Sequence, residues 1–139
     1  MTELPPYLPE NPQPEASRPG RRLWRHKFRD ALKGLKLGIR GQSSFFVHFF
    51  FAALVIAAAI VLRCPVEQWC LLILCIGVVL AAELFNSALE TLFRGLDEEA
   101  RNRAAPALDI AAGAVLLAST LAATVGCIIF GSRVIQLFW

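Results

Sequence analysis

The sequence predicts an all-α membrane protein with an amphipathic surface helix and three transmembrane helices. Apolar residues make up 56% of the 139 residues and charged residues only 18%, against roughly 45–50% and 25% in ordinary globular chains. The charges are also segregated: residues 41–62 and 110–132 carry none, and residues 68–93 carry only Glu83 and Glu90. Because about 20 apolar residues cross a bilayer as a helix, we expect spans at about 44–62, 68–93 and 108–131.

The chain before the first span divides into two segments. Residues 1–20 hold six of the eight prolines and little to bury, which predicts a disordered cytoplasmic tail. Residues 21–41 place apolar side chains at three- and four-residue intervals between Arg and Lys, which predicts a helix lying along an anionic membrane surface. A further interpretation is that cations of this helix, Lys33 among them, also attract the phosphates of a nucleotide. With the spans, this helix forms one membrane domain over residues 21–139.

A short first loop and a longer polar second loop are expected between the spans. The run "FFVHFFFAALVIAAAIVL" has no polar face, which argues against a three-helix bundle in water. Pro65 marks the first turn between spans, and Pro106 suits the first turn of the third helix after a polar loop over 94–107. Of the 14 Lys and Arg residues, nine precede the first span and three lie in that loop. The excess of basic residues places both segments on the cytoplasmic side. The four cysteines show no metal-ligand spacing, and we interpret them as small apolar residues.

Acidic and amide side chains interrupt the end of the second span. Glu83, Asn86 with Ser87, and Glu90 are separated by three, four and seven residues, so they share one helix face. At ~1.5 Å per residue, Glu83 lies about 21 Å and Glu90 about 31 Å from Trp69, an aromatic residue that suits the outer interface. Glu90 is therefore expected at the cytoplasmic boundary, and Asp109 enters the third span at the same level.

Three interpretations of this acidic face are possible. Hydrogen bonding between helices accounts for Asn86 and Ser87, but two glutamates and an aspartate without a membrane-embedded cation need another reason. A proton or ion relay in a small transporter is the second interpretation, although a relay favours an acid near mid-span. The third is an enzyme that uses one carboxylate as a general base and others to bind Mg²⁺ with a phosphate donor. Carboxylates at the water boundary beside a basic helix favour the enzyme.

Three motifs resemble those of the prokaryotic diacylglycerol kinase family, which includes undecaprenol kinases. "ELFNSALETLF" is similar to its Glu-x-x-Asn-[Ser/Thr]-Ala-[Ile/Leu]-Glu signature, "LDIAAGAVLLAS" to its third-span motif, and "FRDALKGLKLGIRGQSSFFVH" to its surface helix and first span. The resemblance covers about residues 23–132. It implies a small kinase of the bacterial inner membrane, typically a trimer, that transfers the γ-phosphate of MgATP to a lipid hydroxyl. The implied partners are ATP, a lipid such as diacylglycerol or undecaprenol, and further copies of the chain, but no nucleic acid.

The resemblance also implies a role for each residue that matches a family motif. Glu83 resembles the family's base, which takes the proton of the lipid alcohol. Asn86 resembles the asparagine near that base, which positions the reacting groups. Glu90 resembles a Mg²⁺ ligand at the nucleotide site, and Asp109 an acid of that site. Ser87 is expected beside the lipid substrate. His48 is expected there too, although it fits a simple contact between helices equally well.

Four positions depart from the family pattern, all on the nucleotide and metal side. Gln42 stands where the family has a Glu that helps to bind Mg²⁺, so a neutral ligand replaces an anionic one. Leu108 replaces a Lys that would contact phosphates, Phe46 replaces an Arg, and Arg94 replaces an Asp. Our hypothesis is that Arg94 or another arginine of the 94–107 segment supplies the missing cation. The alternative to a working kinase is a family member that binds lipid or nucleotide without efficient transfer.

Overall fold

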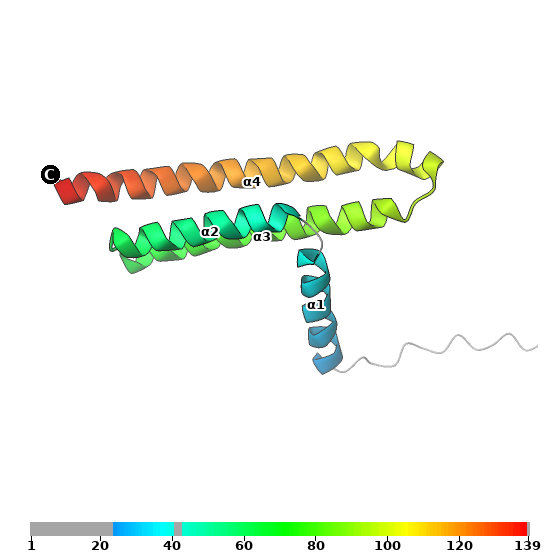
Figure 1. Ribbon diagram of the computed structural model, residues 1–139, viewed down its shortest axis with the longest axis horizontal. Coiled ribbons are helices and arrows are strands. Elements are labelled where there is room, and N and C mark those ends of the chain that lie inside the picture. The colour runs from blue at the N-terminus through cyan, green and yellow to red at the C-terminus, as the bar shows by residue number, and fades with distance from the viewer. Residues whose placement is uncertain (1–23, 41–42, 139) are drawn as a thin grey trace, which may run out of the picture.

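Helices make up nearly all of the described chain. The computed structural model describes residues 24–40 and 43–138, and its elements are α1 (Trp24–Ile39), α2 (Ser43–Val61), α3 (Val66–Arg94) and α4 (Glu98–Phe138). Helices α2, α3 and α4 run alongside one another, and α1 stands across them near the start of α2 (Figure 1). These described residues contain no strand. The all-α prediction is confirmed, whereas the predictions for the tail and for Gln42 lie outside the described residues.

Helices α2, α3 and α4 have the length and composition of membrane spans. The stretches that qualify are Ser44–Val61, Val66–Arg94 and Glu98–Leu137, which confirms three spanning helices. Large apolar side chains such as Phe50 and Leu116 point outward on them and are 65% and 69% exposed. This pattern is expected where the surrounding solvent is lipid, because hydrocarbon tails are as apolar as leucine.

The structure differs from the sequence prediction over residues 94–107. The turn is short and α4 already begins at Glu98, so most of the expected polar loop is helical. Pro106 lies inside α4 and not in its first turn. The helix begins early because the Asp97 carboxylate accepts a hydrogen bond of 2.8 Å from the backbone N–H of Ala100. This is the contact of an N-capping residue, and the two glutamates that follow complement the helix dipole.

Helix α1 presents an uncovered apolar face. Trp24, Phe28 and Leu32 are all exposed, as expected for a helix that lies on a membrane surface. The C-terminal end of α1 is packed closely against α3: a Cβ atom on Gly38 would lie 2.7 Å from Cδ2 of Leu84. This close approach holds the basic helix next to the polar part of α3.

The opposite end of the bundle is closed by packing and hydrogen bonds. A buried cluster joins the three spans there and consists of Ala59, Cys64, Leu72 and Ile129. The guanidinium of Arg133 on α4 donates hydrogen bonds to the carbonyl oxygens of Leu62 at 3.1 Å and Arg63 at 2.9 Å. Carbonyls at the end of a helix lack a partner within it, so Arg133 ties α4 to the end of α2. The helices are thus joined firmly at the end away from the acidic residues.

Candidate active site

The buried face of α3 changes from apolar to polar toward its C-terminal end. Leu72, Glu83 and Ser87 are the buried residues of α3, and the two polar ones are only 3% and 2% exposed. Their spacing of eleven and four residues keeps all three on one helix face. Helix α2 runs antiparallel over this face and brings His48 opposite Glu83.

Glu83 is a buried carboxylate with little compensation. Its Oε2 lies 3.8 Å from Nε2 of His48, which is too long for a hydrogen bond but close enough for attraction when the imidazole is protonated. Its Oε1 is buried, as is the Oγ of Ser87 one turn further on, and neither has a hydrogen-bond partner among the described residues. Burial of an unpaired polar or charged group costs roughly several kcal/mol. A site for a polar ligand explains this arrangement better than a contact between helices.

Glu90 lies two turns beyond Glu83 on α3. The C-terminal part of α3 extends past the start of α2 (Figure 1). Asn86 Nδ2 donates a hydrogen bond of 3.1 Å to Glu90 Oε1, and Arg94 Nη2 donates one of 3.2 Å to Glu90 Oε2. The side chains of Glu90 and Arg94 are 36% and 66% exposed, so the cluster is open at the surface of the described chain. Such an exposed pair contributes only about 0.3–0.5 kcal/mol, so Arg94 can exchange Glu90 for another anion at small cost.

The remaining predicted site residues are placed less closely. Asp109 is exposed on α4, and among the described residues no hydrogen bond or ion pair joins it to Glu83 or Glu90. Lys33 is exposed on α1, and Gln42 lies outside the described residues. No group of three or more His, Cys, Asp or Glu side chains in the described ranges is arranged to hold a metal ion. The structure therefore assembles two clusters around α3, and Asp109 and Lys33 belong to neither of them.

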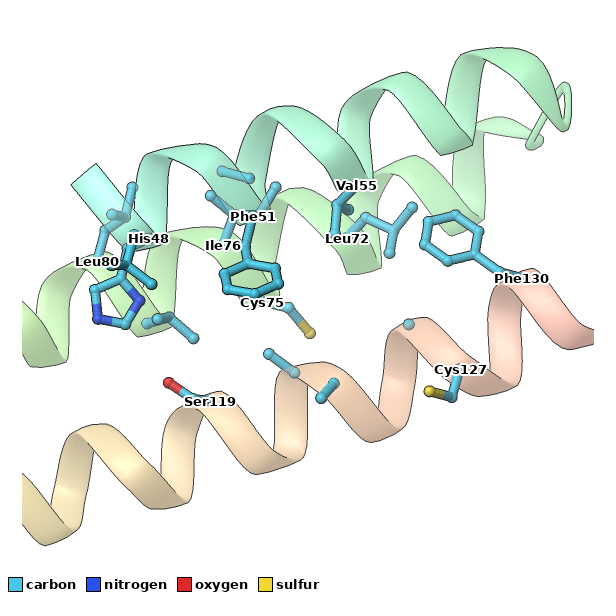
Figure 2. Close-up of a pocket in the computed structure, with 16 residues that line it drawn as sticks. His48, Phe51, Val55, Leu72, Cys75, Ile76, Leu80, Ser119, Cys127 and Phe130 are labelled. Carbon is cyan, nitrogen blue, oxygen red and sulfur yellow. The ribbon is translucent and has the colours of Figure 1, made fainter. Parts of the chain in front are cut away.

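Sequence reasoning did not find a cavity between the three spans. Its volume is about 570 Å³, and α2, α3 and α4 all contribute to its lining. His48 and Ser119 line one end and Phe130 the other, as Figure 2 shows. Small residues occupy three of the five positions 122–126 on α4 and line this space. That run of small side chains is the sequence signal that could have indicated it.

Fold and site together define a small helical integral membrane protein whose polar site lies where α3 emerges from the bundle. The family model described as prokaryotic diacylglycerol kinase matches residues 29–130. The chain therefore belongs to the prokaryotic diacylglycerol kinase family, as the motifs indicated, and this membership implies a membrane lipid kinase. The matched segment includes both clusters on α3 and Asp109. Neither the curated proteins nor the solved structures gave a match.

Proposed function

We propose that this chain transfers the γ-phosphoryl group of MgATP to the hydroxyl of a membrane lipid, diacylglycerol or an undecaprenol-like alcohol. The proposal rests on the burial of Glu83 and on the missing partner of one of its oxygens. This carboxylate is 3% exposed, and its Oε1 has no hydrogen-bond partner in the described part of the chain. Membership of a kinase family supports the same reaction class.

Glu83 has the surroundings that a general base for a lipid alcohol needs. His48 approaches Oε2, which leaves Oε1 to accept a hydrogen bond from the lipid hydroxyl. Ser87 lies one turn away and can bind the same hydroxyl through its Oγ, which orients the oxygen for attack. The proton then passes to Oε1 while the lipid oxygen bonds to the γ-phosphorus and ADP leaves.

The cluster at Glu90 suits the nucleotide side of the reaction. Glu90 is seven residues from Glu83, or about 10 Å along the axis, and lies on the water side of it. One half-exposed carboxylate fits Mg²⁺, which keeps phosphate oxygens and water as most of its ligands. Glu90 would hold the ion, with Asn86 fixing the carboxylate and Gln42 as the proposed neutral ligand. When bound, Mg²⁺ neutralises charge on the transferred phosphoryl group.

Cations near this cluster are proposed to contact the phosphates. Arg94 is the best placed, because it already binds a carboxylate at 3.2 Å and is mostly exposed. Its backbone carbonyl accepts a hydrogen bond of 2.6 Å from Arg101, so a second guanidinium lies next to it. Lys33 and Asp109 are proposed to contact the nucleotide from α1 and α4. In this arrangement Arg94 takes over the role of the lysine that Leu108 replaces.

One observation favours the alternative of a family member without efficient transfer. Both oxygens of Glu90 are engaged, one by Asn86 and the other by Arg94. A metal ion must therefore displace Arg94 or share the carboxylate with Asn86. If Arg94 holds Glu90 permanently, the chain binds lipid or nucleotide and transfers no phosphate.

We also propose that the chain works as a homo-oligomer, most simply a trimer, in the bacterial inner membrane. The Glu90 cluster lies on an exposed face of one chain, so a neighbouring copy is needed to enclose the nucleotide. The N-terminus and the start of α4 are placed on the cytoplasmic side, because twelve of the 14 basic residues lie in or beside these segments.

The test is transfer of ³²P from γ-labelled ATP to a panel of lipids by the purified full chain in lipid nanodiscs. The panel contains diacylglycerol, a polyprenol and total membrane lipid extract, each with and without Mg²⁺. Mg²⁺-dependent labelling of at least one lipid supports the kinase. Nucleotide binding in the absence of labelled lipid supports the non-catalytic alternative.

A further inference from the structure

We infer that the cavity between α2, α3 and α4 binds one hydrocarbon tail of the acceptor lipid, an inference that rests on the proposed function. The first reason is continuity with the proposed base. His48 lines the cavity, and the same imidazole lies 3.8 Å from the Glu83 carboxylate. A lipid whose hydroxyl binds Glu83 can therefore pass its tail beside His48 into the cavity.

The second reason is the polarity of the lining. His48 and Ser119 lie together at one end, and the rest of the lining is apolar apart from thiols (Figure 2). The Oγ of Ser119 is buried and has no hydrogen-bond partner in the described ranges. A molecule that is polar at one end and hydrocarbon elsewhere matches this distribution. Its polar end would lie toward Glu83 and its tail toward Phe130.

The third reason is the depth of the cavity. On α2 the lining extends from Val47 to Val55, and on α4 from Ser119 to Phe130. At ~1.5 Å per residue these stretches are about 12 and 17 Å long. Half of a hydrocarbon core of about 30 Å is about 15 Å, so the cavity reaches from the lipid hydroxyl to roughly the middle of the bilayer. This is the depth of a tail in one leaflet.

The fourth reason is that the cavity opens toward the surroundings of the bundle. Phe51 on α2 and Cys127 on α4 line the cavity and are themselves exposed. The cavity therefore opens sideways, and a tail can enter it without leaving the apolar phase.

A tail bound in this cavity positions the lipid hydroxyl and adds little to the affinity of the protein for the lipid. Moving hydrocarbon from lipid to an apolar cavity gains little, because lipid tails are as apolar as the lining. The gain is that a held tail fixes the hydroxyl at Glu83 Oε1, which lowers the entropy cost of transfer. The cavity takes one tail, so a two-chain lipid leaves its second chain in the bilayer, and a polyprenol extends beyond the cavity.

The test uses a long-chain primary alcohol that carries a photoreactive diazirine halfway along its tail. The probe is irradiated with the full-length protein in nanodiscs, and labelled residues are mapped by mass spectrometry. Ala52→Leu fills the cavity from α2, and Ala53→Leu is the matched control because Ala53 is exposed and outside the lining. Ala122→Leu fills the cavity independently from α4. An alkane with the same diazirine and no hydroxyl is the control for nonspecific partition.

We expect labels on cavity residues such as Val55 and Leu72, with the alcohol labelling more strongly than the alkane. Because a leucine side chain occupies the space that the tail would fill, Ala52→Leu and Ala122→Leu should reduce labelling of the cavity residues several-fold, and Ala53→Leu should not. Labels confined to outward residues such as Leu54, equal labelling by the alkane, or equal loss in Ala53→Leu would overturn the inference. Labelling needs no phosphoryl transfer. Correct labelling without transfer therefore refutes the proposed function, and transfer with labels only outside the cavity refutes the tail site.

Discussion

Replacing Glu83 by glutamine distinguishes a catalytic role of this carboxylate from a structural role. The substitution keeps the shape of the side chain and removes the proton acceptor. Loss of a general base typically reduces the rate 10²–10⁴-fold, which corresponds to about 2.7–5.4 kcal/mol in the activation barrier. The free energy of unfolding should rise or stay unchanged. An amide avoids burying a charge whose Oε1 has no partner among the described residues.

A structural role for Glu83 predicts the opposite pattern. If its attraction to His48 over 3.8 Å held α2 against α3, glutamine would lower the thermal stability, and His48→Gln would lower it similarly. The assay measures lipid phosphorylation, nucleotide binding and thermal stability on the same nanodisc preparations. Glu67→Gln is the matched control, since Glu67 is exposed at the start of α3. Activity of Glu83→Gln within a few-fold of wild type, or a clear drop in its stability, would refute the assignment as general base.

Four further substitutions test other parts of the proposal. Gln42→Glu restores the acid usual in the family and should lower the Mg²⁺ concentration for half-maximal activity; no shift in a Mg²⁺ titration would show that position 42 does not face the metal. Arg94→Ala should raise the KM for ATP if Arg94 binds phosphates, whereas unchanged KM with tighter Mg²⁺ binding would mean that it only occupies Glu90. Arg133→Ala leaves the half-buried carbonyl of Leu62 and the exposed carbonyl of Arg63 without their donor and should destabilise the bundle by about 1–3 kcal/mol; an unchanged melting temperature contradicts that role. A cysteine introduced at Gln68 should react with an impermeant thiol reagent added outside intact cells. Labelling only from inside would contradict the proposed cytoplasmic N-terminus.

The sequence by itself determined the helical class, the three spans and the polar positions of the candidate site. This was possible because each rests on a local property: uncharged runs of spanning length, and acids spaced by three, four and seven residues along one helix. The early start of α4 at Glu98 also had a local signal, since Asp97 followed by two glutamates is a typical helix start. The sequence prediction gave more weight to Pro106 and placed the start too late.

Only the tertiary structure decided how the polar residues of α3 divide into two clusters. The helical repeat places Glu83 and Glu90 on one face, but the cover of α2 buries Glu83 against His48 and leaves Glu90 half-exposed in contact with Asn86 and Arg94. Periodicity cannot predict this difference, because burial depends on where a second helix ends. The cavity likewise exists only because α2, α3 and α4 leave space between side chains that are distant in the sequence. Its volume depends on the angles and distances between helices, which no single segment encodes.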